Sequence, residues 1–372
     1  MKTEVIVLGR NVKAIILGDA MIPYNVFIKA WNEHLSSILG KNVVAGNFEE
    51  NWEKLQYRRL EVEKYGPEIE EVDELIIKEG NDAEIILGLF VPLSKKVMDA
   101  MPNLRIIGVS RAGLENVNVE EATKRGILVF NVLGRNAHAV SDFTIGLMLA
   151  EARNIARAHY SIKNGEWRKT FANSDYIPEL RGKTVGLVGL GHIGRLVAKK
   201  LSGFDVNIIT YDPYVSDEVL EEAGVKRVEL NELFEQSDFV SVHARLTDEN
   251  KQMIGVEQLN RMKKTAIFIN TGRAGLVDYD ALAKVLKERK ILGAALDVFT
   301  TEPIPQDSPL LELDNVTLTT HIAGTTADAL NNSPFMLTED IAKFLKDENP
   351  RFIVNPEVLE DKSFKQWLDT IL

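Results

Sequence analysis

Short apolar runs alternate with helical patterns along the chain of 372 residues, and this alternation restricts the possible folds more than any other feature. It is typical of parallel strands that are joined by crossover helices. The runs that we expect to be strands form two series. The first is 14–17, 42–45, 83–87, 105–109 and 127–131, and the second is 184–188, 207–211, 239–242, 266–270, 293–296 and 316–319.

The two series predict two domains, since a chain of this length exceeds what a single core usually needs. We therefore expect an α/β protein with two doubly wound parallel sheets. Residues 137–163, rich in Ala, Leu and Ile, predict one long buried helix that joins domains or contacts another subunit. The charged stretch 49–78 predicts exposed helices with a break at Gly66 and Pro67, and residues 338–346 predict a last helix.

The composition excludes several classes of function. With 55 acidic against 44 basic residues the net charge is -11, so nucleic acid and membrane surfaces are poor partners. The absence of cysteine excludes disulfides and thiolate chemistry. Residues 1–20 are interrupted by Arg10, Lys13 and Asp19 and do not resemble a signal peptide, and no apolar window is long enough to span a bilayer. We therefore expect a cytoplasmic protein.

A glycine-rich turn follows the first strand of the second series. Gly189, Gly191 and Gly194 form the pattern G-x-G-x-x-G, and an amphipathic helix over 193–201 follows. In a dinucleotide site the first glycine permits the tight bend, the second lets the backbone approach the pyrophosphate, and the third lets helix and strand pack closely. The helix N-terminus would face the anion.

An acidic residue, Asp212, ends the next strand, 18 residues after Gly194. A carboxylate there accepts hydrogen bonds from the adenosine-ribose hydroxyls and repels a 2′-phosphate, so we expect NAD rather than NADP as the cofactor. The alternative is a structural turn followed by an ordinary strand-terminal aspartate.

Three side chains that suit carbonyl reduction follow successive strands of the second series. The reaction needs a cation for the substrate carboxylate, a proton donor and a carboxylate that orients the donor. Arg273, His321 and Glu302 supply these groups, and of the six histidines only His243 and His321 follow predicted strands. Taken singly, each of these residues can be explained without a function, as an exposed arginine, a core histidine or a loop glutamate. Because the carboxyl ends of parallel strands lie side by side, we expect the three to meet.

At these residues the sequence resembles the D-isomer-specific 2-hydroxyacid dehydrogenases. The matching segments are 182–194, 269–278, 295–299, 302–303 and 321–324, and the similarity extends more loosely from about residue 83 onward. The resemblance implies an NAD-dependent enzyme that interconverts a small 2-oxo acid and a D-2-hydroxy acid. We expect a phosphoglycerate dehydrogenase-like chain without a regulatory domain, since the sequence stops soon after the last predicted helix.

The resemblance also implies roles for single residues. Arg273 would bind the substrate carboxylate and polarise the carbonyl, His321 would protonate the oxygen, and Glu302 would hold the imidazolium. Asp297 would bind the nicotinamide carboxamide. The further cofactor contacts would be His192, Ile193, Asp212 and Thr271.

The family's architecture implies a flavodoxin-like substrate domain, residues 1–135 and 330–372, and a Rossmann NAD-binding domain, residues 136–329, with a cleft between them. The family also implies a homodimer through the NAD-binding domain, to which the apolar helix after Ala137 would contribute. We expect no metal, because hydride transfer needs none and the carboxylates form no ligand-spaced cluster.

The sequence departs from the family where substrates are chosen, at the loop of Leu89 and Phe90 and at Arg111. The usual polar run Arg-Ser-x-Thr is replaced by Gly-Leu-Phe-Val-Pro at 88–92, and the segment from Arg111 is two residues shorter than Arg-x-Gly-x-Gly-x-Asp-Asn. Arg245 stands where proline is typical and leaves some use of NADP open. The particular acid therefore stays open.

Two alternatives accompany this prediction. D-3-phosphoglycerate dehydrogenase would need cations for a phosphate, and Lys95, Lys96, Arg111 and Arg135 are the candidates. An NAD-sensing protein like the family's transcriptional corepressors would not need the acid-base pair. Formate dehydrogenase is disfavoured, because it has glutamine where Glu302 stands.

Overall fold

The computed structural model describes residues 11–371, which divide into two compact units. The first unit comprises the described residues up to Arg135 together with those from Thr326 onward, and the second is Asn136–Thr325. The sequence predicts this second boundary a few residues later, between residues 329 and 330. The first half of the 1–20 segment lies outside the described residues. In the described part, no helix is both long and apolar enough to cross a membrane.

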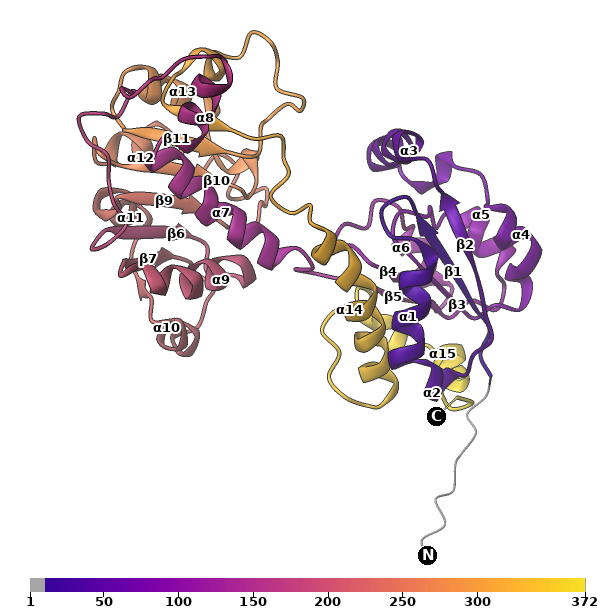
Figure 1. Cartoon of the computed structure of the whole chain (residues 1–372). Coiled ribbons are helices and arrows are strands. Elements are labelled where there is room, and N and C mark those ends of the chain that lie inside the picture. Colours follow the sequence, from indigo (N-terminus) through magenta and orange to yellow (C-terminus); the bar gives the residue numbers. More distant parts are fainter. Residues whose placement is uncertain (1–10, 372) are drawn as a thin grey trace, which may run out of the picture. The chain divides into compact units, whose positions relative to one another are not determined.

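The first unit contains a five-stranded parallel sheet in the order β2-β1-β3-β4-β5 (Figure 1). This is the flavodoxin-like order, in which the strand order reverses between β1 and β3. The strands are β1 (Ala14–Asp19), β2 (Val43–Glu49), β3 (Ile85–Gly88), β4 (Ile106–Val109) and β5 (Leu128–Phe130). The helices are α1 (Tyr24–His34), α2 (Ser36–Leu39), α3 (Trp52–Tyr65), α4 (Glu74–Glu79), α5 (Lys95–Ala100), α6 (Val119–Lys124), α14 (Ala327–Leu345) and α15 (Lys362–Leu368), with 3₁₀ turns η1 (Pro67–Ile69), η2 (Gly80–Asp82) and η6 (Pro356–Glu360).

The second unit contains a seven-stranded parallel sheet in the order β12-β11-β10-β9-β6-β7-β8. Counted from β6, this is the Rossmann order with one further strand, and the reversal lies between β6 and β9. The strands are β6 (Thr184–Val188), β7 (Asn207–Tyr211), β8 (Lys226–Arg227), β9 (Phe239–Val242), β10 (Ile267–Asn270), β11 (Gly293–Leu296) and β12 (Val316–Leu318). The helices are α7 (Ala137–Ala152), α8 (Ile155–Lys163), α9 (His192–Leu201), α10 (Asp217–Ala223), α11 (Leu230–Gln236), α12 (Val256–Arg261) and α13 (Tyr279–Lys287), with 3₁₀ turns η3 (Ser202–Phe204), η4 (Ala274–Leu276) and η5 (Pro309–Glu312).

Each sheet is covered on both faces, which is why its strands read as nearly continuous apolar runs. Along β1, Ala14 and Ile16 belong to one apolar cluster, whereas Ile15 and Leu17 belong to another on the opposite face. All predicted strands are present in the structure. Only β8 was not predicted, because its two residues are exposed and charged.

The last long helix of the first unit is longer than the sequence indicated. It begins at Ala327, where the Thr326 hydroxyl accepts a hydrogen bond from Ala329 N at 3.0 Å, rather than at residue 338. Pro334 lies inside this helix and hid its first half, since proline usually ends one. The helix continues through Pro334 because its buried face packs against α1.

The single helix expected over 137–163 is wrong, since the structure has two helices there. α7 ends at Ala152 and α8 begins at Ile155, with Asn154 in the left-handed conformation at φ 58°. The chain bends because Arg157 at the start of α8 turns back to pair with Glu151, whose carboxylate it binds through Nη2 at 2.7 and 2.8 Å. The Thr317 hydroxyl of β12 donates to the same carboxylate at 2.7 Å.

Removal of the Arg157 charge should destabilise the second unit. The Glu151 side chain is only 3% exposed and burial raises the pKa of its carboxyl, so the carboxylate depends on its partners. We expect Arg157→Met to cost roughly 3–5 kcal/mol of unfolding free energy, because a buried charge then lacks its counter-ion. Urea unfolding measures this cost. Arg181→Met, at a side chain that is 83% exposed, is the control, and equal losses in the two variants would contradict the argument.

Candidate active site

The glycine turn lies at the carboxyl end of β6, next to the reversal of strand order. Gly189 has φ +98°, and a Cβ there would lie 2.6 Å from the Ala244 backbone N. A Cβ on Gly194 would lie 2.3 Å from the Gly189 carbonyl oxygen, whereas one on Gly191 would meet nothing within 4 Å. The outer glycines are therefore required by packing, and the middle one leaves the backbone open, which fits a pyrophosphate.

The start of α9 and the end of β7 complete this region. Gly191 is the N-cap of α9 and has no side chain to cap it, so the first N–H groups of the helix suit an oxyanion. The Asp212 carboxylate accepts hydrogen bonds from the backbone N of Leu190 at 2.8 Å and of Tyr214 at 2.9 Å. Asp212 thus lies against the glycine turn and also braces it, a structural role that the sequence did not indicate.

Glu302 and His321 form a hydrogen-bonded pair. The His321 Nδ1 lies 2.7 Å from Glu302 Oε2, and Phe299 N donates to Glu302 Oε1 at 2.9 Å. Because both carboxylate oxygens are held, the imidazole has a fixed partner on Nδ1 and presents Nε2 to a ligand. His321 has φ 56°, a left-handed conformation that is uncommon for a residue other than glycine.

The segment that carries His321 is held by a buried carboxylate. Asp297 follows β11 and is completely buried, and it accepts hydrogen bonds from the Thr319 hydroxyl at 2.6 Å, Ile322 N at 3.0 Å and Ala323 N at 2.9 Å. The Asp297 side chain therefore holds the backbone on both sides of His321. This role was missed in the sequence, where the only signal was an acidic residue at the end of an apolar strand.

A second braced turn carries Arg273 after β10. The buried Asn270 side chain accepts from Gly272 N at 3.0 Å and donates to the Arg273 carbonyl at 3.3 Å. The next residue, Thr271, shares a 2.7 Å hydroxyl hydrogen bond with Thr144 of α7. The Arg273 side chain is exposed and forms no ion pair within the described part of the chain, so its guanidinium is available to an anion.

Arg273, Glu302 and His321 line one hollow of about 480 Å³, as strand order predicted. Lys251 and Gln252 line it too, and no sequence pattern had marked either residue. Gln252 N donates to the Gly275 carbonyl at 2.8 Å, which holds this loop beside the Arg273 turn. The hollow therefore combines two cations, an amide and a carboxylate–imidazole pair.

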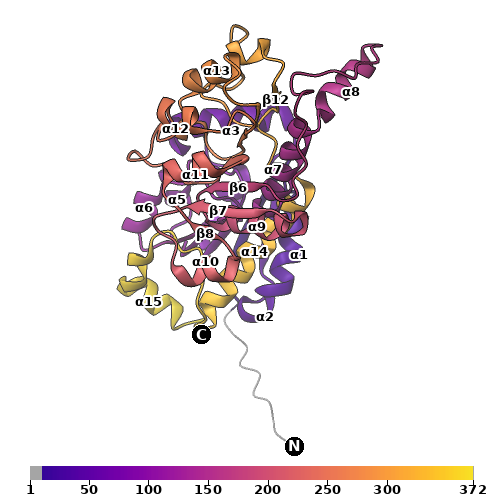
Figure 2. The ribbon, with the colours of Figure 1, turned by 90° about the vertical axis from the view of Figure 1, so that its left-hand side faces the viewer.

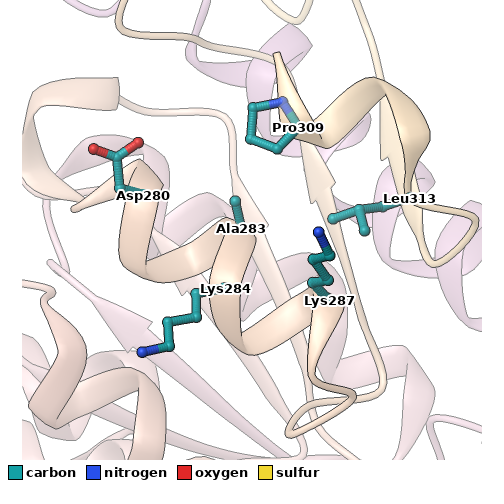
Figure 3. Close-up of a pocket in the computed structure, with 6 residues that line it drawn as sticks. All are labelled: Asp280, Ala283, Lys284, Lys287, Pro309 and Leu313. Carbon is teal, nitrogen blue, oxygen red and sulfur yellow. The ribbon is translucent and has the colours of Figure 1, made fainter. Parts of the chain in front are cut away.

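Another hollow of about 240 Å³ lies between α13 and η5 (Figure 3). Its lining contains Asp280, Lys284 and Lys287, whose charged ends point in different directions in the figure. None of the residues that line it is a histidine, and no carboxylate there is paired with a proton donor. We assign no chemistry to this hollow.

His243 follows β9 and lies beside the glycine turn. The His243 Nε2 is 2.9 Å from the Ser241 hydroxyl, while Nδ1 is buried without a hydrogen-bond partner among the described residues. Burial lowers the pKa of this imidazole to about 4, since no counter-charge offsets the loss of water. His243 is therefore neutral at physiological pH.

The substrate candidates of the first unit lie at the carboxyl ends of β3 and β4. Leu89 and Phe90 are buried, and the Arg111 Cζ lies 4.6 Å from the centroid of the Phe90 ring. The Arg111 guanidinium is already paired, because its Nη2 lies 2.9 Å from Glu63 and 3.0 Å from Glu115. The structure thus brings Phe90 and Arg111 together but neutralises the arginine.

Comparisons with known proteins agree with this geometry. Residues 145–323 match the family model described as the NAD binding domain of D-isomer specific 2-hydroxyacid dehydrogenases. The glyoxylate reductase of Korarchaeum cryptofilum is 41% identical over 77% of this chain and 87% of its own length. The D-3-phosphoglycerate dehydrogenase of Methanocaldococcus jannaschii is 42% identical over 79% of this chain, which spans only 54% of that protein.

A solved structure shares the fold. It is the NAD-complexed D-isomer specific 2-hydroxyacid dehydrogenase of Lactobacillus delbrueckii ssp. bulgaricus, with a TM-score of 0.71 and 23% identity. The match covers 92% of this chain and all of that one. At this identity the comparison supports the architecture alone.

The neutral His243 should make folding sensitive to acid. Its folded pKa of about 4 lies below the ordinary 6.5, so unfolding takes up a proton between these values and stability falls as the pH falls through that window. His243→Gln should reduce the slope of unfolding free energy against pH by up to about 1.4 kcal/mol per pH unit. Urea unfolding across the window measures the slope, with His138→Gln, at an exposed histidine, as control. An unchanged slope in His243→Gln would refute the assignment.

Proposed function

Because the chain belongs to the D-isomer-specific 2-hydroxyacid dehydrogenase family and is an NAD-dependent enzyme, we propose that it interconverts a small 2-oxo acid and its D-2-hydroxy acid with Arg273, Glu302 and His321 as the catalytic residues. The observation that carries this proposal is the convergence of the three side chains on one hollow, with the Glu302–His321 hydrogen bond at 2.7 Å. An exposed guanidinium beside a braced imidazole suits a substrate with a carboxylate next to a carbonyl.

Arg273 binds the substrate carboxylate in this proposal. A guanidinium offers parallel N–H donors that match the two oxygens of a carboxylate, and the same charge polarises the adjacent carbonyl. The absence of an ion pair on Arg273 in the described residues supports this role. Lys251, on the same hollow, adds a positive charge to the side from which an anion enters.

His321 transfers the proton of the reaction, and Glu302 holds His321 in place. His321 Nε2 donates its proton to the carbonyl oxygen during reduction and accepts it back during oxidation. The Glu302 carboxylate accepts the Nδ1 hydrogen bond, which fixes the orientation of the ring and leaves Nε2 to face the substrate. When bound, NADH supplies the hydride that reduces the carbonyl carbon.

The cofactor-binding residues in this proposal all lie in the second unit, Asn136–Thr325. The open backbone at Gly191 and the start of α9 at His192 and Ile193 receive the pyrophosphate, and Asp212 receives the adenosine ribose. Thr271 and Asp297, to which the family resemblance assigns the nicotinamide, follow β10 and β11. Both are buried in the structure, and both oxygens of Asp297 accept hydrogen bonds from the segment around His321. The first unit is the substrate domain in this assignment.

Among substrates, we favour small unphosphorylated 2-oxo acids. Three of the four cations considered for a phosphate are already paired, since Lys95 binds Asp99 at 3.0 Å, Lys96 binds Glu71 at 2.9 Å, and Arg111 binds two glutamates. The glyoxylate reductase and D-3-phosphoglycerate dehydrogenase relatives make both substrates reasonable candidates for an assay. A corepressor-like NAD sensor is less well supported, because the acid-base pair is intact.

The reaction is tested by following NADH and NADPH absorbance with a panel of 2-oxo acids. We expect oxidation of NADH by glyoxylate or hydroxypyruvate, and a lower kcat/KM for 3-phosphohydroxypyruvate. A preference for the phosphorylated acid would select the phosphoglycerate alternative. Binding of NADH without turnover of any acid would favour a sensor.

His321→Ala should lower kcat by roughly 10²–10⁴-fold, because the proton donor is lost. NADH binding, measured by fluorescence titration, should stay within about twofold, since the side chain is placed at the proton-transfer step rather than on the dinucleotide. His138→Gln, at an exposed histidine outside α8, is the control for the loss of a histidine elsewhere. Full turnover in His321→Ala would remove His321 from the mechanism.

For the subunit contact, we propose a homodimer through α8 and the segment after it. In Figure 2, α8 extends beyond the helices that cover the sheet of the second unit. The apolar side chains of α8 are unusually exposed, with Tyr160 at 72% and Ile162 at 57%, and Trp167 in the segment after it is 79% exposed. A patch of this kind usually marks a protein interface.

Charges in this patch should prevent association. We expect the double variant Ile162→Glu with Trp167→Glu to elute as a monomer in size-exclusion chromatography with light scattering, whereas the unaltered chain elutes as a dimer. Tyr57→Glu, at an exposed tyrosine of the first unit, is the control and should stay dimeric. A monomeric parent chain, or a dimeric double variant, would disprove this interface.

A further inference from the structure

Unsatisfied hydrogen-bond donors gather in the first unit. Six side-chain polar atoms in the described part of the chain are buried without a partner, and four of them belong to this unit. They are Gln56 Nε2, Arg59 Nε, Ser110 Oγ and Arg135 Nη1. Buried polar groups are normally paired, because an unmade hydrogen bond in the interior is costly, so a group of such atoms indicates a missing partner.

Two of these side chains, Ser110 and Arg59, lie at the carboxyl edge of the first sheet. Ser110 follows β4 directly and is completely buried, and its backbone N donates to the Gly88 carbonyl of β3 at 2.9 Å. Arg59, from α3, has its Cζ 5.7 Å from the centroid of the Phe90 ring, which also contacts Arg111. Phe90 N donates to Asp19 at the end of β1 at 3.3 Å. This edge of an open α/β sheet is where ligands bind.

The arginines at this edge differ in how closely they are paired with carboxylates. Arg111 holds two glutamates, whereas Arg59 Nε lies 3.8 Å from Glu63, too far for a hydrogen bond. Arg135 forms no ion pair in the described residues. Burial, and then the nearby charge of Arg111, lowers the pKa of Arg135, and the buried Asp19 opposes this only in part. Arg59 and Arg111 therefore lie around Phe90, and Arg135 lies near Arg111. Among the described residues, Arg59 Nε and Arg135 Nη1 have no hydrogen-bond partner.

The donor set defines the class of the absent partner. Two guanidinium groups, an amide N–H and a hydroxyl can all donate, and an oxyanion has several acceptor oxygens for such donors. Arg59 keeps 29% of its side chain exposed, which gives solutes access. We propose that the first unit binds a carboxylate or phosphate group through Arg59, Ser110 and Arg135, with Gln56 beside them.

This site also supplies what the loop at 88–92 lacks. That loop has no charged residue, and the cations beside Phe90 are Arg59 from α3 and Arg111, of which Arg111 is already paired with glutamates. The oxyanion is either a second carboxylate of an unphosphorylated substrate, which rests on the proposed function, or a free anion that binds by itself. The same donors would bind the oxyanion in both cases, so separate measurements are needed to tell a substrate group from a free anion.

Direct binding tests the site without reference to turnover. Inorganic phosphate and malonate are titrated calorimetrically into the full chain carrying Arg273→Met, so that the catalytic guanidinium does not contribute. We expect binding that Arg59→Gln and Ser110→Ala each weaken about tenfold or more, since charge-assisted hydrogen bonds are lost. Arg181→Gln is the matched control and should bind as its parent does. Absence of binding, or binding that Arg59→Gln leaves unchanged, overturns the proposal.

A second measurement identifies the source of the anion and guards against misfolding. With Arg273 restored, the KM for oxaloacetate is compared with that for glyoxylate, which has no second acidic group. If the anion is part of the substrate, Arg59→Gln raises the KM for oxaloacetate about tenfold and leaves that for glyoxylate unchanged. If the anion is free, phosphate binding weakens in the variant while both KM values stay the same. Arg59→Lys, which keeps the charge and the fold, should retain binding better than Arg59→Gln, and equal losses would count against a charge-based site.

Discussion

The parallel pairing of strands is the constraint on which the rest of the molecule depends. A chain that runs the same way along every strand of a sheet must leave each strand at the same edge. In the second unit the registers of β9, β10 and β11 align Val242, Asn270 and Leu296, so the residues that follow these strands are brought together. Residues as distant in sequence as the glycine turn and His321 therefore lie at the same edge of one sheet.

Buried polar side chains turn this approximate placement into a defined one. Asp297 and Asn270 make no contact with solvent, and their hydrogen bonds go to the backbone that carries His321 and Arg273. A buried carboxylate or amide is stable only when it is fully paired, so these turns have little freedom to move. The two reactive side chains can then remain exposed while their backbones stay fixed. In the first unit the opposite holds, since Arg59 Nε and Arg135 Nη1 are buried and have no hydrogen-bond partner in the described part of the chain.

The sequence predicted those parts of the fold and the site that depend on local pattern. Strands buried on both faces are strongly apolar, and residues such as Arg273 and His321 follow them directly. Features set by distant contacts were not visible. The bend at Asn154 depends on a pairing of Glu151 with Arg157 and Thr317, and β8 has no apolar residue to mark it. The position of Arg59 against Phe90 likewise arises only when α3 packs on its sheet.

The interrupted first unit has a consequence for synthesis on the ribosome. The helix α14, which packs against α1, is translated only after the whole second unit, the 190 residues from 136 to 325. At typical translation rates of ~5–20 residues per second, that takes roughly ten to forty seconds. The second unit is one continuous segment and can fold as soon as it emerges. During that interval the apolar residues of α1, among them Phe27 and Trp31, await Leu337 and Ile341, so the nascent chain exposes a hydrophobic face that chaperones would recognise.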